Sequence, residues 1–310
     1  MHKIPVCFAF DNKLIEAAGV CFASLLLNAY SDTFYDIYVL HSLTVTLDEV
    51  ELRRAIAPFK NCNLTLVEVD NSFEDAYEIR HVTKATYYRL LIPEILPQFD
   101  KIIYSDVDII FQNDLSEAFN IDLGDAYVAG VPDIGMNTFC TQYLNDVVKI
   151  PKWDYLQAGF LILNLKAMRA DGLVSKFKAE ATKNYTYQDQ DIVNIICAGR
   201  KVMLPPYLNV NDCAYIQFYA YKPDLPIWMT EEQILRARRS GNMHYSGYKP
   251  WQRYSIAFDL WWEYYRRSAI FDERRYFKFF LDKTSLLDSL SLWKRIKGIA
   301  RYFVYGRYKG

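Results

Sequence analysis

The chain has 310 residues, and its 36 basic side chains nearly balance its 37 acidic ones. A hydrophobic fraction of 52% excludes an intrinsically disordered chain, and a net charge of −1 argues against a nucleic-acid partner, because phosphate binding needs an excess of Lys and Arg. None of the six cysteines lies in a Cys-x-x-Cys pair, and no apolar run reaches about 18 residues. We therefore expect a globular, cytoplasmic protein without a zinc ribbon or a membrane span.

The N-terminal part of the chain alternates strand and helix patterns. An apolar run over 4–10 predicts a strand that is buried on both faces, and 14–28 has the spacing of a helix. The next strands are expected at 35–40, 63–69 and 101–105, with helices at 46–59, opened by a capping-box pattern at its first residues, and at 83–91. This alternation predicts an α/β fold with a mostly parallel sheet and a ligand site beyond the carboxyl ends of its strands.

The second half is less regular. The elements expected there are a buried strand at 158–165, a helix to about residue 185, a short helix from 189 to 199, a short strand at 201–204 and a helix that begins at 230. From Tyr254 onward the sequence is helical, aromatic and increasingly basic. We expect a catalytic domain over 1–252 and a helical extension over 253–310.

Asp106 and Asp108 interrupt an otherwise apolar segment. Side chains two residues apart on an extended segment point to the same face, where two like charges repel each other unless a cation lies between them. Mg²⁺ or Mn²⁺ would relieve this repulsion and bring phosphate oxygens with it, so the pair predicts a metal site. The alternative is that one Asp caps a helix and the other is solvated.

Other polar residues are less specific. Asp11 follows the first strand, where a ligand of such a sheet is expected to bind. Asp189–Asp191 is a second Asp-x-Asp, but its residues can equally begin a helix. His244, with Lys249 five residues on, could add a third metal ligand and a phosphate-binding cation, although a lone His is more often structural.

Arg89 and Gly159 also have two interpretations. Arg89 is either solvated or holds a phosphate or sugar, and Gly159, just before a strand, suggests a close approach of the backbone to a ligand. The chain has no Gly-x-Gly-x-x-Gly, no P-loop and no Gly-x-Ser-x-Gly elbow. A diphosphate held by a metal is the remaining mode of nucleotide binding.

Taken together, six blocks in order resemble glycosyltransferase family 8. They are Val6–Asp11, Thr86–Leu90, Tyr104–Asp108, Gln157–Gly159, Tyr187–Asp191 and His244–Gly247. The resemblance runs from the first strand to Trp251 and implies a GT-A fold, a Rossmann-like mixed sheet flanked by helices. It also implies retaining transfer of galactose or glucose from a UDP-sugar to a glycan or lipid-linked acceptor, as in lipopolysaccharide or surface-glycan synthesis.

The same resemblance implies roles for individual residues. The implied ligands of Mn²⁺ (or Mg²⁺) are Asp106, Asp108 and His244. The residues implied at the UDP-sugar are Ala9 and Asp11 at the uridine, Val107, Gln157, Gly247 and Lys249 along the donor, and Arg89, Asp189 and Gln190 at the reacting sugar. Gln157 departs from the family's usual Asn, and 247–249 is one residue shorter than usual.

The reaction itself leaves two mechanisms open. We favour attack of the acceptor hydroxyl from the face that the diphosphate leaves. A double displacement would need a nucleophile on the opposite face, where Gln190 or Asp189 is nearest. The alternative functions are an inactive UDP-sugar-binding scaffold and a nucleotidyltransferase. A nucleotidyltransferase would need a glycine-rich basic loop after the first strand, and residues 10–13 are not such a loop.

The C-terminal tail is a separate feature. Residues 293–310 carry no acidic side chain, and aromatic rings alternate with six basic residues: Lys294, Arg295, Lys297, Arg301, Arg307 and Lys309. This composition is typical of a segment that lies on an anionic leaflet, so we expect peripheral contact with the inner face of the plasma membrane. The alternative is a solvated or docked helix.

Overall fold

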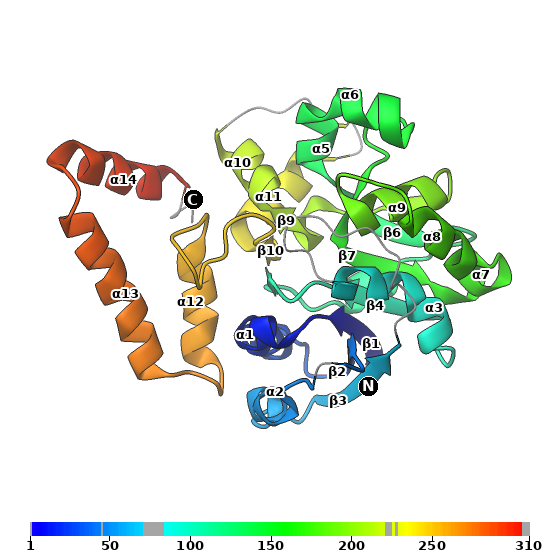
Figure 1. Ribbon diagram of the computed structural model, residues 1–310, viewed down its shortest axis with the longest axis horizontal. Helices are drawn as coiled ribbons and strands as arrows, with labels where there is room; N and C mark the ends of the chain where they lie inside the picture. Colours follow the sequence, from blue (N-terminus) through cyan, green and yellow to red (C-terminus); the bar gives the residue numbers. More distant parts are fainter. Residues whose placement is uncertain (1, 45, 71–83, 221–224, 227–228, 306–310) are drawn as a thin grey trace.

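The structure is a computed structural model that describes residues 2–44, 46–70, 84–220, 225–226 and 229–305. A seven-stranded sheet has the order β3-β2-β1-β4-β7-β6-β8, and a small sheet has the order β5-β10-β9 (Figure 1). The strands of the large sheet are β1 (His2–Ala9), β2 (Thr33–Ser42), β3 (Cys62–Val69), β4 (Lys101–Ser105), β6 (Val128–Pro132), β7 (Leu156–Asn164) and β8 (Lys201–Met203). Those of the small sheet are β5 (Ile109–Ile110), β9 (Val210–Asn211) and β10 (Met243–His244).

The large sheet is mixed. Strands β3, β2, β1 and β4 run parallel, as predicted, whereas β7 is antiparallel to both β4 and β6. The strand order changes direction at β1, because β2 and β3 are added on one side of it and β4 on the other. Asp11 and Asp106 follow the carboxyl ends of β1 and β4, so both lie at this switch point, where open α/β sheets bind ligands.

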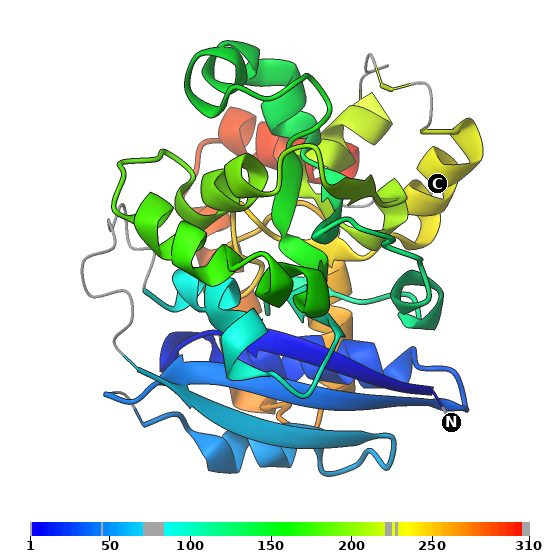
Figure 2. The same cartoon turned by 90° about the vertical axis from the view of Figure 1, so that its right-hand side faces the viewer.

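Helices cover both faces of the sheet (Figures 1 and 2). Alternation along β1 explains this arrangement, because Val6 and Phe8 join the core under α1 (Ile15–Leu27), while Cys7 joins the core on the opposite face. The helices of the first face include α1, α2 (Glu49–Ile56), α10 (Asp212–Ala220), α11 (Glu231–Ser240) and α12 (Phe258–Arg267). Those of the second face are η2 (Lys84–Leu91), α3 (Ile92–Ile95), α7 (Leu165–Ala170), α8 (Leu173–Ala181) and α9 (Gln188–Ile196).

The shorter helices lie in connections. They are η1 (Asn12–Leu14), α4 (Ser116–Phe119), α5 (Ile134–Phe139), α6 (Thr141–Tyr143), η3 (Leu144–Val148) and η4 (Pro206–Leu208). The sequence did not predict β6 or the helical segment from α5 to η3. These elements are short, and the pattern of a short apolar run does not distinguish a strand from a buried helix.

Three predicted helices differ in detail. Helix α2 begins at Glu49 because Asp48, rather than Thr46, is the cap and accepts a hydrogen bond from the Glu51 amide at 3.1 Å. The helix predicted at 83–91 is the 3-10 helix η2, and residue 83 lies outside the described residues. The helix expected to reach residue 185 is divided into α7 and α8 at Gly172, whose φ of 60° is in the left-handed region.

The C-terminal segment contains three helices: α12, α13 (Glu273–Asp288) and α14 (Leu292–Tyr305). Trp261 and Trp262 of α12 are buried in the same core as α1, and the Tyr264 hydroxyl accepts a hydrogen bond from Asn28 Nδ2 at 2.7 Å. Helix α13 packs against α12, with the ring centroids of Trp262 and Phe279 4.5 Å apart, and α14 follows it at the outer side of the molecule (Figure 1). No helix in the described residues is long and apolar enough to cross a membrane. The last residues of the tail, including Arg307 and Lys309, lie outside the description.

The two ends of this segment provide a test of how much it contributes to stability. Trp262 is 0% exposed and Trp293 is 80% exposed. We expect Trp262→Ala to lower the free energy of unfolding by about 3–5 kcal/mol, because it leaves a cavity, and Trp293→Ala to change it by less than about 0.5 kcal/mol. Urea unfolding followed by far-UV circular dichroism measures both. Equal losses would mean that α14 packs against the body.

Candidate active site

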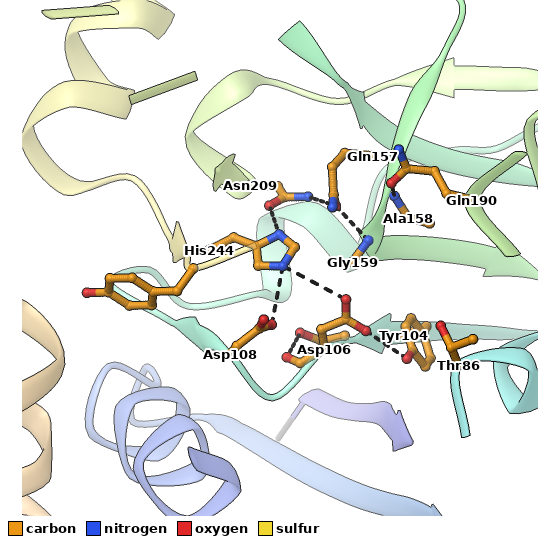
Figure 3. Close-up of polar contacts among 12 residues, drawn as sticks. Thr86, Tyr104, Asp106, Asp108, Gln157, Ala158, Gly159, Gln190, Asn209 and His244 are labelled. Carbon is orange, nitrogen blue, oxygen red and sulfur yellow. Dashed lines mark hydrogen bonds and ion pairs between the residues drawn. The ribbon is translucent and has the colours of Figure 1, made fainter. Parts of the chain in front are cut away.

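Two aspartates and a histidine meet where β4 ends. Asp106 and Asp108 follow β4, and β5 begins one residue later. Strand β10 pairs antiparallel with β5 so that His244 lies opposite Ile109, which brings the imidazole next to Asp108. One ligand atom from each of Asp106, Asp108 and His244 lies within 4.8 Å of the other two (Figure 3). The predicted trio is therefore assembled by the register of a two-residue strand.

The surroundings of Asp108 suit a cation. Its Oδ2 accepts a hydrogen bond from Lys249 Nζ at 2.5 Å, and its Oδ1 lies 3.2 Å from His244 Nε2. Within the described part of the chain, no well-aligned donor reaches this buried Oδ1. Burial raises the pKa of Asp108, but Lys249 and His244 outweigh it and hold the pKa far below its usual value. Two hard carboxylates and an imidazole nitrogen are a donor set that fits Mn²⁺.

Arg89 joins the two Asp motifs. Its buried guanidinium donates to Asp106 Oδ1 at 2.9 Å through Nη2, and its Nε lies 3.0 Å from Asp189 Oδ2. Nη1 donates to the Ala158 carbonyl oxygen at 2.6 Å. Burial lowers the pKa of Arg89, but the two carboxylates outweigh this and raise it. The structure therefore shows Arg89 holding Asp106 and Asp189 in place, and its predicted direct contact with the donor stays a prediction.

Asp189 and Gln190 lie in the first turn of helix α9. Asp189 Oδ1 accepts a hydrogen bond from Thr86 Oγ1 at 2.8 Å, and burial raises the pKa of its carboxyl. Gln190 Oε1 accepts from the Ala158 amide at 3.0 Å, while its Nε2 lies 3.3 Å from Asp133 Oδ2. Gln190 thus faces β7, which contains the Gln157–Gly159 block, whereas Asp189 faces Thr86 and Arg89 of η2.

Asp191 has a different environment from Asp189. The hydroxyls of Tyr143 and Tyr155 each donate to it at 2.6 Å, and the Tyr187 amide donates at 2.9 Å. This buried carboxylate anchors α9 to the segment that contains η3. The sequence gave no signal for the tyrosine pair, because the partners are 48 and 36 residues away.

A cavity of about 240 Å³ lies between these residues. The predicted site residues that line it are Arg89, Asp106, Gln157, Gly159, Asp189 and Gln190. Two segments that are distant in sequence, one after β4 and one at the start of α9, thus share a single hollow. Gln157 lines this hollow, but its Oε1 is already engaged by Asn209 Nδ2 at 2.7 Å and by the Gly159 amide at 2.6 Å.

The residues predicted to bind the nucleotide lie around the same edge of the sheet. Ala9 ends β1, Asp11 Oδ1 accepts from the Lys13 amide at 3.0 Å, and Val107 is buried between the two aspartates. Lys249 Nζ also donates to the Tyr245 carbonyl oxygen at 2.6 Å, which fixes it beside Asp108. Their contacts with a donor stay predictions.

Asp212 is a residue that the sequence analysis missed. Its Oδ2 accepts a hydrogen bond from the Gly247 amide at 2.7 Å, and a Cβ at position 247 would lie 2.2 Å from that oxygen. Glycine is thus required at 247 for this close approach. Among the described residues, no donor reaches the buried Asp212 Oδ1, and burial raises the pKa of Asp212 to about 6.

The comparison with known families agrees with this geometry. The protein-family model described as glycosyl transferase family 8 matches residues 5–255 of this chain. The chain belongs to glycosyltransferase family 8. Similar proteins include general stress protein A of Bacillus subtilis, 24% identical over 249 residues that cover 78% of this chain and 85% of that protein. The lipopolysaccharide 1,2-glucosyltransferase of Escherichia coli K12 is 23% identical, over 82% of this chain and 74% of that enzyme.

Solved structures show the same fold. The galactosyltransferase LgtC, in complex with donor and acceptor sugar analogues, superposes with a TM-score of 0.74 at 23% identity, over 87% of this chain and 98% of LgtC. The bifunctional glycosyltransferase WbbM superposes with a TM-score of 0.69 at 25% identity, over 84% of this chain, which spans 49% of WbbM. The predicted GT-A fold is thus confirmed, and family membership makes this chain a glycosyltransferase.

Substitution of Gly159 tests the metal site, because a side chain at this position would collide with two of the predicted ligands. A Cβ there would lie 2.3 Å from His244 Cε1 and 2.8 Å from Asp106 Oδ2. We expect Gly159→Ala to displace two of the three ligands and to weaken Mn²⁺ binding by about 10- to 100-fold in isothermal titration calorimetry. Gly130→Ala on β6, whose Cβ would have buried atoms of Leu156 and Leu161 as its nearest neighbours, at 3.0 Å or more, is the control and should bind Mn²⁺ normally. Unchanged affinity in Gly159→Ala would contradict the assignment.

Asp212 gives a prediction on stability and pH. Because the pKa of its carboxyl is higher in the folded state than in the unfolded chain, ionised Asp212 destabilises the fold, and this loss grows as pH rises through the interval between the two values. We expect Asp212→Asn to raise the unfolding free energy of the metal-free protein by about 2 kcal/mol at about pH 7.5, with almost no gain at about pH 4. Urea unfolding at the two pH values measures this.

The exposed Asp146→Asn is the control for that experiment and should leave stability unchanged at both pH values. A gain from Asp212→Asn that is equal at the two pH values would show that ionisation of Asp212 is not its cause.

Proposed function

We propose that this chain is a retaining hexosyltransferase that moves galactose or glucose from a UDP-sugar to a saccharide acceptor. The observation that carries the proposal is the trio Asp106, Asp108 and His244 beside the cavity that Arg89, Asp189 and Gln190 line. These three residues would hold Mn²⁺ (or Mg²⁺), and the cation, when bound, supplies positive charge that stabilises the departing diphosphate.

Protein groups complete the donor site in this proposal. Lys249 lies beside Asp108 and adds a second positive charge for the diphosphate, already aligned by the Tyr245 carbonyl. Ala9 and Asp11, at the end of β1, receive the uridine, and Val107 and Gly247 line its path to the metal site. In this proposal the nucleotide lies over the carboxyl ends of β1 and β4, because ligands of open α/β sheets bind at the point where the strand order reverses.

The contacts of Asp189 and Gln190 favour attack from the front face. Both Asp189 oxygens are engaged, Oδ1 by Thr86 and Oδ2 by Arg89, which lowers the nucleophilicity of the carboxylate. Gln190 is an amide, a poor nucleophile, and both ends of its side chain have partners. We therefore infer that the acceptor hydroxyl attacks from the side that the diphosphate leaves. A stable sugar adduct on either residue would overturn this mechanism.

The tail and the relatives motivate a proposal for the acceptor and for the location of the enzyme. A lipid-linked saccharide suits both an enzyme similar to a lipopolysaccharide glucosyltransferase and a tail that can lie on a membrane. Apolar side chains spaced along α14 are exposed, with Lys294 and Lys297 exposed beside them. These apolar residues are Leu292, Trp293, Ile296 and Ile299. We infer peripheral contact with the anionic inner face of the plasma membrane.

A flotation experiment tests the membrane contact. A chain that ends at residue 290 should fail to float with vesicles that contain anionic lipid, whereas the full chain should bind them, and increasingly so at low salt. Neutral phosphatidylcholine vesicles are the control. Equal flotation of the two chains would reject the role of the tail.

The reaction is tested by release of UDP from a panel of UDP-sugars with and without Mn²⁺. We expect one donor to be hydrolysed or transferred in the presence of Mn²⁺, and Asp108→Ala to lower this rate by at least about 100-fold, because Asp108 holds the charge that stabilises the leaving group. Asp100→Ala, an exposed carboxylate before β4, is the control and should react like the wild type. Tight UDP-sugar binding without turnover would indicate a binding protein, and absence of binding would reject the proposal.

A further inference from the structure

The imidazole of His244 is held from both sides. Its Nε2 faces Asp106 and Asp108, and its Nδ1 lies 3.0 Å from Asn209 Oδ1 (Figure 3). His244 is buried, with 1% of the residue's surface exposed. A neutral His can bind a metal only through the nitrogen that carries no proton, so the partner of the other nitrogen decides which one can act as the ligand.

A backbone group determines the direction of every hydrogen bond in this chain of contacts. The Gly159 amide can only donate, and it lies 2.6 Å from one terminal atom of Gln157, which must therefore be the acceptor Oε1. Asn209 approaches the same oxygen at 2.7 Å and must present its donor, Nδ2. Its other terminal atom is then the acceptor Oδ1, which faces His244 Nδ1.

This order requires that Nδ1 of His244 carries the proton. Because the roles start from a backbone N–H, flipping either amide would bring two donors or two acceptors together. Strand pairing keeps the parts in register, since β9, which starts at the residue after Asn209, pairs with β10, which ends at His244. At the other end of this series of contacts, Gln157 and Gly159 lie two residues apart on β7.

We infer that Gln157 and Asn209 are positioning residues that hold His244 in the Nδ1–H tautomer and thereby present Nε2 as the ligand of the divalent cation. This inference rests on the proposed function, because it assumes that His244 binds the cation. It gives Gln157 a role that the resemblance does not imply: its carbonyl oxygen orients a metal ligand, whereas the Asn usual at this position is expected to contact the sugar.

The variants are chosen by hydrogen-bonding role. Asn209→Leu and Gln157→Leu each remove a link at similar volume, so Mn²⁺ affinity should fall by about 10- to 100-fold. Gln157→Glu keeps an acceptor for both the Gly159 amide and Asn209 Nδ2, and should bind Mn²⁺ within about threefold of the wild type. Gln112→Leu, which removes a half-buried amide outside the chain of contacts, is the matched control.

Three measurements separate positioning from a loss of fold. Electron paramagnetic resonance gives the Mn²⁺ dissociation constant, and circular dichroism checks folding. ¹⁵N NMR of the Mg²⁺-loaded protein with labelled histidines reports which nitrogen of His244 carries the proton, with only four histidines to assign. The wild type and Gln157→Glu should show a protonated Nδ1, and the two leucine variants should show a mixture of the two tautomers.

The outcomes distinguish this inference from the proposed function. Folded Asn209→Leu with wild-type Mn²⁺ affinity, or a wild type protonated at Nε2, would overturn the positioning role. A wild type that binds Mn²⁺ with the expected variant series but releases no UDP from any UDP-sugar would reject the proposed function and leave the positioning role standing. A wild type that binds no Mn²⁺ would reject both.

Discussion

The balance of charge at the carboxyl ends of the strands is the constraint on which the site depends. Asp106, Asp108 and Asp189 lie at the edge of a hydrophobic core, where ionised carboxylates are costly unless cations accompany them. Arg89 joins Asp106 to Asp189, and Lys249 pairs with Asp108. One buried oxygen of Asp108 is left facing His244. The protein thus neutralises most of this negative charge itself and leaves a defined place for a cation.

The topology supplies the remaining parts of the site. Reversal of the strand order between β1 and β4 opens the crevice, and the antiparallel strand β7 brings Gln157 and Gly159 to the edge where β4 ends. The Asp106 amide donates to the Gly159 carbonyl oxygen at 2.8 Å, so the two motifs are joined through the backbone. The small sheet then delivers His244 from late in the chain. Three segments that are distant in sequence are fixed to one another by strand pairing rather than by flexible loops.

Local patterns predicted much of the fold. Continuous apolar runs indicated β1 and β4 because strands buried on both faces need apolar side chains on both, and α11 begins at the predicted capping box of Thr230 and Gln233. Short elements were harder to predict. Strand β6 has five residues, and β5, β9 and β10 have two each, so their existence depends on partners elsewhere in the chain.

The sequence by itself determined the family, the α/β alternation and the residues Asp106, Asp108 and His244, because residue type and order are enough to recognise these features. Only the tertiary structure decided which partner each of the polar residues contacts. It turned Asp189 toward Arg89 and Asp191 toward two tyrosines, although both belong to the same short motif. It also connected Gln157 to His244 through Asn209 and placed Asp212 under Gly247. Such contacts join positions 35 to 100 residues apart, and their geometry is set by strand register and burial, which no local pattern encodes.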